Sequence, residues 1–278
     1  MVIQHSLMIF QDHVDFYNLV SNFMGVFLDP MEDNIEFKML DQPCRCGPMH
    51  MLLAIINQKK CIAFKRCWDN DRWIRQELIV ADAKKKLDFP YYKIMKINGL
   101  KIKHVWPNFD VRKIREFYSL DTLMIDFGNY NSCKNFTNLC IGNIKNLDNF
   151  CYDYGRWAAF NYLLGVNDRK EENFIFDIDN QVLHSVDNEE GPLEPNRRHQ
   201  IGTSNILIKT QRNISKFIEG KDKKELVACL QRGFLDGFYQ VSKNLSLLHM
   251  FTENERQLMY QKASVPPRII SETLFSVS

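Results

Sequence analysis

Residues 163–191, LLGVNDRKEENFIFDIDNQVLHSVDNEEG, restrict the fold more than any other stretch of the chain. The segments NFIFDI (173–178) and QVLHSV (181–186) read as two short strands. The dipeptide Asp-Asn at 179–180 between them is a turn signal. The pattern therefore predicts a β-hairpin, and a hairpin brings the residues at its two ends together.

Three oxygen-bearing side chains flank this hairpin: Asp168 and Asn173 on one side and Asp187 on the other. Each alone would be an ordinary polar turn residue. Together they have the spacing Asp-x-x-x-x-Asn, then a strand pair, then Asp, which is that of the catalytic machinery of kinases. Oxygen ligands around one point suit Mg²⁺. The pattern predicts that Asp168 accepts or orients the proton of an acceptor hydroxyl, and that Asn173 and Asp187 hold the metal.

Composition places the chain among ordinary soluble globular proteins. It has 278 residues, enough for one large domain or two lobes, with 45% hydrophobic and 25% charged residues. A formal net charge of +2 gives no global attraction to nucleic acid or acidic lipid, so no nucleic-acid partner is expected. No apolar run reaches the roughly 18 residues that span a bilayer, so no transmembrane segment is expected.

Location and redox state follow from the same kind of evidence. Polar residues interrupt the first 20 residues, which lack a basic leader and a small-residue cleavage site, so we expect a cytoplasmic protein with reduced thiols. A secreted variant is a minor alternative, because Asn135, Asn213 and Asn244 begin Asn-x-Ser/Thr triplets. Four cysteines could be considered as zinc ligands, but their spacing matches no closed zinc motif: Cys44, Cys46, Cys61 and Cys67.

Residues 49–67 predict two apolar strands around the turn NQKK. The second strand ends in Ala63-Phe64-Lys65, which fits the Ala-Ile-Lys pattern of a kinase strand that carries the ATP-positioning lysine. On this tripeptide alone, Lys65 would be interpreted as a surface lysine whose stem covers apolar neighbours.

The segment 70–87 predicts a helix whose apolar face carries Ile74, Leu78 and Ala81, with Glu77 on that same face. A carboxylate on a buried stripe needs a partner, and Lys65 is the obvious candidate, as in the strand-to-helix ion pair of kinases. The alternative is that Glu77 lies at the edge of the stripe and is solvated.

The tripeptide Asp126-Phe127-Gly128 is identical to the magnesium-binding signature of protein kinases. No catalytic loop precedes it, because Asp110 is followed five positions on by Arg115 rather than by asparagine. We therefore interpret 126–128 as the end of a strand that runs into a polar connector at 128–138, and we expect the backbone near Asp126–Gly128 to lie against the adenine of ATP.

Two further segments complete the outline. Residues 35–51 predict strand, turn, strand, and the turn at 42–48 stands where a loop covering the phosphates belongs. That turn contains one glycine, Gly47, and no Gly-x-Gly-x-x-Gly, so the sequence leaves open whether it covers the phosphates. Residues 222–245 have the apolar spacing of a long helix.

Over residues 65–190 the chain resembles atypical kinases of the protein-kinase-like superfamily, near the phosphoinositide 3/4-kinase and HipA-like branches. The segments that carry the resemblance are IAFKR, RQELIV, GVNDRKEENFIF and LHSVDNEEG. The resemblance implies a two-lobed α+β kinase fold, with an antiparallel-sheet N-lobe at 1–128 and a mainly helical C-lobe at 129–278. It also implies ATP and Mg²⁺ as cofactors, bound between the lobes, and transfer of the γ-phosphoryl group to a hydroxyl.

The choice of acceptor stays open among three classes. Lys170, two residues after Asp168, is the arrangement of serine/threonine protein kinases, where the lysine neutralises the γ-phosphate, and this class is preferred. A phosphoinositide or other small-molecule kinase is the alternative, with Arg197, Arg198 and His199 as an anion-binding cluster. The third class is a nucleotide-binding scaffold without turnover. Residues 192–278 contain no motif that names the acceptor.

Overall fold

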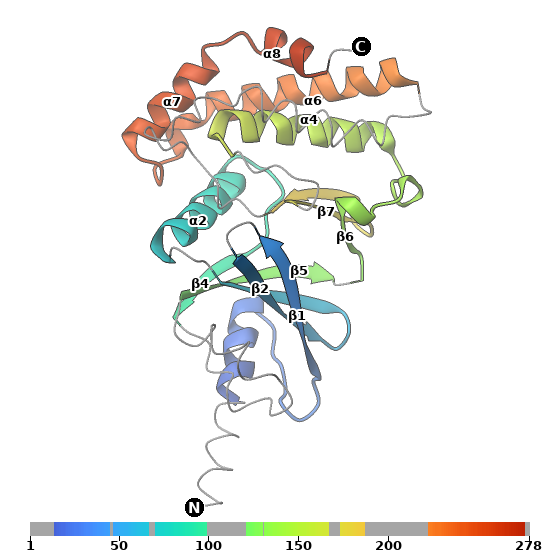
Figure 1. Ribbon diagram of the computed structural model, residues 1–278, viewed down its shortest axis with the longest axis vertical. Coiled ribbons are helices and arrows are strands. Elements are labelled where there is room, and N and C mark those ends of the chain that lie inside the picture. The colour runs from blue at the N-terminus through green and yellow to red at the C-terminus, as the bar shows by residue number, and fades with distance from the viewer. Residues whose placement is uncertain are drawn as a thin grey trace, which may run out of the picture. The chain divides into compact units, whose positions relative to one another are not determined.

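The computed structural model describes residues 14–44, 47–66, 70–98, 121–129, 131–166, 173–186 and 222–275. It is an α+β structure whose sheets are antiparallel (Figure 1). The chain divides into two compact units: residues 1–74 with 92–131, and residues 75–91 with 132–278. The sequence predicted a single boundary at 128, whereas this division also assigns residues 75–91 to the second unit; the two functional lobes stay a prediction.

The first unit is built on a five-stranded sheet of order β1-β2-β3-β5-β4. Its strands are β1 (Ile35–Cys44), β2 (Gly47–Ile56), β3 (Lys60–Arg66), β4 (Ile94–Asn98) and β5 (Asp121–Asn129). A helix at 14–24, which the sequence reading missed, contributes Phe16 and Phe23 to the core against Phe64 and other residues on one face of the sheet. Alternation along β3 places Lys65 on the opposite face from Phe64.

The strands of this unit confirm most of the predicted pattern. The hairpin at 49–67 is formed by β2 and β3, and Asn57 and Gln58 turn the chain with positive φ values of 49° and 57°. The segment before the connector is a strand, β5. The predicted turn at 42–48 is shorter than expected, because β1 continues to Cys44 and β2 begins at Gly47. Residues 45–46 lie outside the described residues, so the covering of phosphates by this turn stays a prediction.

The second unit combines helices with a small sheet of order β6-β7-β8. Its elements are β6 (Cys133–Asn135), α4 (Leu147–Leu164), β7 (Phe174–Asp177), β8 (Val182–Ser185), α6 (Lys223–Lys243), α7 (Glu253–Ala263) and α8 (Pro267–Leu274), with short 3₁₀ turns at 136–138, 141–143 and 245–247. The helix predicted at 222–245 is confirmed as α6. The segment predicted as a polar connector contains the strand β6, which pairs with β7. The three residues of β6 show no apolar pattern from which a strand could be predicted.

Helix α2 (Asn70–Lys86) confirms the predicted helix but shifts its buried face. Glu77 is buried as expected, whereas Leu78 and Ala81 are only half-buried. The buried positions of the helix are Ile74, Gln76, Glu77, Ile79, Val80, Ala83 and Lys84. Three of these buried side chains are polar. A prediction from the apolar residues alone therefore places the centre of the buried face about one position away from where it lies.

Both ends of α4 are specified by local sequence. Asn146 is the N-cap, and its side chain accepts a hydrogen bond of 3.0 Å from the backbone N–H of Asn149. Gly165 ends the helix with φ +71°, a conformation that favours glycine. The backbone N–H of Val166 then donates to the carbonyl of Asn161 at 3.0 Å. The helix therefore ends at Leu164, four residues before Asp168, which lies outside the described residues.

Helices α4 and α6 lie side by side and are held in unusually close contact by glycines (Figure 1). A Cβ atom added at Gly233 of α6 would lie 1.9 Å from the carbonyl oxygen of Tyr152. One added at Gly155 of α4 would lie 2.2 Å from the carbonyl oxygen of Leu230. Because both obstacles are main chain, no side-chain rotation relieves them, and the two helices need glycine at this contact.

None of the helices in the described parts of the chain is long and apolar enough to cross a membrane.

We expect Gly233→Ala to lower the free energy of unfolding by about 2–3 kcal/mol, because overpacking against main chain outweighs the ~1 kcal/mol by which alanine is the better helix former. Urea unfolding followed by circular dichroism measures this. Gly142→Ala is the control, since a Cβ there meets no atom within 4 Å and should change stability by less than ~0.5 kcal/mol. Equal stability of the Gly233 variant would contradict the contact.

Candidate functional site

The predicted hairpin is formed by β7 and β8, with Phe174 opposite Ser185 and Asp177 opposite Val182. Its strands are slightly shorter than predicted, and the turn occupies 178–181. At the open end the backbone N–H of Val186 donates to the carbonyl of Asn173 at 2.8 Å. Asn173 is therefore a neighbour of Val186, the residue that precedes Asp187 in the sequence.

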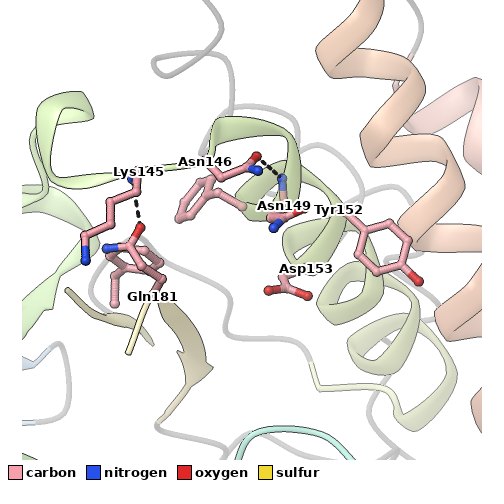
Figure 2. A pocket seen from close by; sticks show the side chains of 8 residues that line it. Lys145, Asn146, Asn149, Tyr152, Asp153 and Gln181 are labelled. Atoms are coloured by element: carbon pink, nitrogen blue, oxygen red, sulfur yellow. Dashed lines mark hydrogen bonds between the residues drawn. The ribbon is translucent and has the colours of Figure 1, made fainter. Parts of the chain in front are cut away.

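The turn of the hairpin is held by side chains (Figure 2). The Gln181 side chain accepts from the backbone N–H of Lys145 at 2.8 Å and donates to the carbonyls of Asn143 and Ile178. Burial would raise the pKa of Asp177, but hydrogen bonds from Asn180, Ser132 and the Asp179 amide outweigh it and lower that pKa. These contacts fix the hairpin against the start of α4.

A hollow of about 440 Å³ lies beside this turn, lined by the start of α4 and by the hairpin (Figure 2). Two of its amide side chains serve the fold, since Asn146 caps α4 and Gln181 binds the main chain before it. Burial raises the pKa of Asp153 on its wall, opposed by Arg156. The hollow is at the turn of the hairpin, whereas the predicted catalytic residues belong to the open end.

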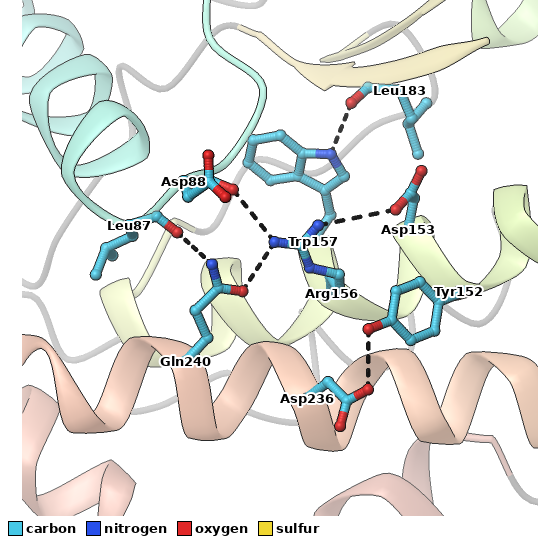
Figure 3. A network of polar contacts seen from close by, with 9 residues as sticks. All are labelled: Leu87, Asp88, Tyr152, Asp153, Arg156, Trp157, Leu183, Asp236 and Gln240. Carbon is cyan, nitrogen blue, oxygen red and sulfur yellow. Dashed lines mark hydrogen bonds and ion pairs between the residues drawn. The ribbon is translucent and has the colours of Figure 1, made fainter.

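The outer edge of β8 is covered by donors from two helices. β8 is the last strand of its sheet, and its Leu183 carbonyl accepts from the indole N–H of Trp157 in α4 at 2.8 Å (Figure 3). The Ser185 carbonyl accepts from the ammonium group of Lys84 in α2 at 2.6 Å. Burial, followed by the charge of Lys84 and opposed by Asp177, lowers the pKa of His184 between them to about 4, so the ring is neutral at pH 7.

The C-terminal end of α2 is attached to α4 and α6 (Figure 3). Arg156 of α4 donates to the Asp88 carbonyl at 3.2 Å and to the Gln240 side chain of α6 at 2.8 Å. Gln240 in turn donates to the Leu87 carbonyl. The guanidinium group of Arg156 also lies 4.8 Å from the centre of the Phe89 ring. The helix that carries Glu77 is thus fixed to the two central helices of its unit.

Arg75, on the same helix, makes a further contact within the second unit. Its guanidinium group lies 3.5 Å from the Glu255 carboxylate and donates to the Met250 carbonyl at 3.4 Å. Glu255 also completes the capping box of α7 with Thr252. Helix α2 is therefore held toward its N-terminal end as well.

The predicted ATP-positioning residues lie in regular elements. Lys65 of β3 and Glu77 of α2 are each 4% exposed, so neither is the solvated surface residue of the alternative interpretation. They belong to different compact units, and their pairing stays a prediction.

The tripeptide 126–128 lies within β5, where Asp126 is opposite Ile62 of β3. The Asp126 carboxylate accepts from the backbone N–H of Gly128 at 2.9 Å, and Gly128 has φ +71°. This carboxylate therefore binds the main chain two residues further on, and its place outside the metal site stays a prediction. Contact of this backbone with adenine stays a prediction.

The other predicted residues lie outside the described part of the chain. They are the catalytic pair Asp168 and Lys170, the metal ligand Asp187, and the basic cluster Arg197, Arg198 and His199. Of the cysteines with a zinc-like pattern, Cys46 and Cys67 also lie outside it, while Cys61 is buried in β3.

Sequence reasoning missed Lys84, Trp157, Arg156 and Lys262, which hold the elements around the predicted site. Lys84 begins the run Lys84-Lys85-Lys86, which looks like a solvated helix end. Its position seven residues after Glu77 was the available signal, because residues two turns apart share a helix face.

Comparisons with known proteins find similarity of structure alone. No protein-family model and no curated protein matches the chain. A Helicobacter pylori proinflammatory kinase, CtkA, has a TM-score of 0.39 and 12% identity, over 88% of this chain and 97% of that one. The open conformation of CtTel1 has a TM-score of 0.31 and 13% identity, over 86% of this chain and 12% of that one. A structure of the FAT and kinase domain of CtTel1 has a TM-score of 0.31 and 12% identity, over 86% and 22%.

The chain thus spans less than a quarter of either CtTel1 chain. TM-scores below 0.5 do not establish a common fold, so the functional proposal below rests on the residues themselves.

Lys262 of α7 holds the end of α4 that leads to Asp168. Its ammonium group donates to the Tyr162 carbonyl at 2.8 Å and lies 5.5 Å from the centre of that ring. Burial lowers the pKa of Lys262 from 10.5 to about 8. Between these two values the unfolded chain binds a proton that the folded chain has released, so this lysine makes the protein more stable as the pH rises.

We therefore expect the unfolding free energy of the wild type, relative to Lys262→Met, to rise by ~1–2 kcal/mol from pH 8 to pH 9.5. Urea titrations of both proteins at each pH measure the difference. Lys224→Met, which removes an exposed lysine from α6, is the matched control. The same pH slope for both variants would contradict the burial of a titrating ammonium group at Lys262.

Proposed function

We propose that the protein is an ATP- and Mg²⁺-dependent phosphotransferase that moves the γ-phosphoryl group to a hydroxyl acceptor. The observation that carries the proposal is the hydrogen bond of 2.8 Å between Val186 and Asn173. It supports the proposal because the main chain of Asn173 is paired with the residue that precedes Asp187 in the sequence. With Asp168 five residues before Asn173, these three residues are the set that phosphoryl transfer requires.

The donor set fits magnesium. Asn173 is 4% exposed, and a buried amide at the open end of a hairpin is ordered by its surroundings before any ligand binds. Asn173 and Asp187 would hold the ion, since Mg²⁺ takes amide and carboxylate oxygens and retains phosphate oxygens as further ligands. When bound, the ion neutralises negative charge on the phosphates.

The remaining roles belong to side chains of the chain itself. Asp168 accepts or orients the proton of the acceptor hydroxyl, and Lys170 neutralises the phosphoryl group as it moves. Lys65 positions the phosphates of ATP, and Glu77 orients Lys65 through an ion pair. The backbone near Asp126–Gly128 contacts adenine. Positioning and charge neutralisation then supply most of the rate enhancement.

The acceptor we propose is a serine or threonine hydroxyl of a protein. Lys170 supports this class, since it stands where serine/threonine protein kinases carry the lysine that contacts the γ-phosphate. The Arg75-Gln76-Glu77 sequence resembles lipid kinases. In this chain Arg75 binds Glu255 and the Met250 carbonyl, a structural role that needs no lipid substrate.

The test compares nucleotide binding and turnover in Asp168→Ala and Asp187→Ala. Loss of the Asp168 carboxylate should leave ATP affinity within a few fold and lower turnover by roughly two to four orders of magnitude, the range for a positioned acid or base. Loss of the Asp187 carboxylate should remove the part of ATP binding that depends on Mg²⁺. Calorimetry measures affinity, and radiolabelled ATP with the protein itself, a basic protein and phosphoinositide vesicles measures transfer.

Asp126→Ala is the matched control, because it removes an identical carboxylate from the tripeptide interpreted as a strand end. It should retain Mg²⁺-dependent binding and most turnover. Comparable losses in folded Asp126→Ala and Asp187→Ala would show that the wrong aspartate was assigned. Nucleotide binding by the wild type without transfer to any acceptor would identify a scaffold rather than an enzyme.

A further inference from the structure

Within the part of the chain that the structure describes, the outer edge of β8 is covered by side chains and not by another strand. Leu183 and Ser185 are two residues apart, so their carbonyls leave the strand on the same edge. β7 occupies the other edge. Trp157 donates to the first carbonyl at 2.8 Å and Lys84 donates to the second at 2.6 Å. An open edge is thus covered by two specific donors from two different helices.

Of the two donors, Lys84 binds the end of β8 that leads to the predicted metal site. It is 4% exposed, and its ammonium group lies 5.3 Å from the centre of the Trp157 ring. Ser185, which it binds, is 2% exposed and lies opposite Phe174, the neighbour of Asn173. A buried ammonium group bound to a carbonyl fixes that main chain more firmly than a neutral donor, because charge-assisted hydrogen bonds are the stronger ones. The next residue forms the bond to Asn173, and the one after it is Asp187.

The same helix carries Glu77. Lys84 follows Glu77 by seven residues, about two turns or roughly 10 Å along the axis, and both side chains belong to the buried stripe of α2. The end of α2 that follows Lys84 is held by Arg156 and Gln240 through the carbonyls of Asp88 and Leu87. A displacement of α2 would therefore move the point to which β8 is attached.

We propose that Lys84 is a positioning residue for the metal site: through the Ser185 carbonyl it holds the end of β8 in register with α2, beside the bond between Val186 and Asn173. This inference rests on the proposed function. Lys84 touches neither nucleotide nor metal in this proposal; it acts through the main chain of two residues. The helix that carries Glu77 and the strand that leads to Asp187 are thereby placed as one unit.

The test uses Lys84→Met, which keeps the length of the side chain and removes its donor. The half-saturating Mg²⁺ concentration for ATP binding should rise at least tenfold, while ATP affinity without metal stays within twofold. The amide of Val186, whose bond to Asn173 closes the hairpin, should exchange its hydrogen faster. Lys85→Met is the matched control, since it removes a lysine from the adjacent, exposed position. It should leave all three measurements within twofold.

Two further variants separate positioning from general stability. Trp157→Phe removes the donor to Leu183 but keeps Lys84, so it should lower the thermal midpoint and raise the half-saturating Mg²⁺ concentration less than Lys84→Met does. Lys84→Gln retains a polar group too short to reach the same carbonyl and should raise the half-saturating Mg²⁺ concentration as Lys84→Met does.

An unchanged half-saturating Mg²⁺ concentration in folded Lys84→Met would overturn the inference and leave the proposed function standing. Failure of both Lys84 variants to fold would assign the residue to folding and overturn it as well. A wild-type protein whose ATP binding ignores Mg²⁺ would instead overturn the proposed function, and this inference with it.

Discussion

Helices α4 and α6 meet where each has glycine facing the main chain of the other, and the arrangement of the second unit depends on this contact. Gly155 and Gly233 leave no space for a methyl group between the helices. Two hydrogen bonds bridge the contact, Tyr152 with Asp236 and Arg156 with Gln240, and the residue number rises by four on both helices from the first pair to the second (Figure 3). The two helices therefore run in the same direction, and side chains from both reach the elements packed beside them.

From that contact the structure extends outward through donors to main-chain carbonyls. Arg156 and Gln240 hold the end of α2, Trp157 holds β8, and Lys262 holds the last turn of α4. Each bond reaches a carbonyl at the end of a helix or on the edge of a sheet, where regular structure leaves acceptor capacity free. Long polar side chains suit this task because their apolar stems pack in the core while their ends reach the main chain.

The sequence predicted those helices and strands whose apolar residues repeat with a clear period and whose ends carry turn or capping residues. The β7–β8 hairpin, the β2–β3 hairpin, α2 and α6 were all predictable, since each has a clear apolar period bounded by turn or capping residues. β6 was missed because its three residues carry no apolar pattern. The helix at 14–24 was also missed, although Phe16, Tyr17, Val20 and Phe23 recur at helical spacing and are buried.

Of the candidate site, the sequence could predict residue types and spacing but not the residues that hold them. Asn173 followed from the spacing to Asp168 and Asp187. Lys84 and Lys262 did not, because a lysine in a polar run gives no sign that folding will bury it against a carbonyl far away in the sequence. Tertiary contacts of this kind join residues far apart in the sequence, so no local pattern reveals them.

The central claim is that the open end of the β7–β8 hairpin holds a metal ion together with nucleotide phosphates. The most direct test is a crystal structure with Mn²⁺ in place of Mg²⁺ and a non-hydrolysable ATP analogue. The account predicts an anomalous peak about 2.0–2.2 Å from the side-chain oxygens of Asn173 and Asp187, with phosphate oxygens completing the coordination. A nucleotide bound with its metal on other residues, or a peak at Asp126, would contradict it.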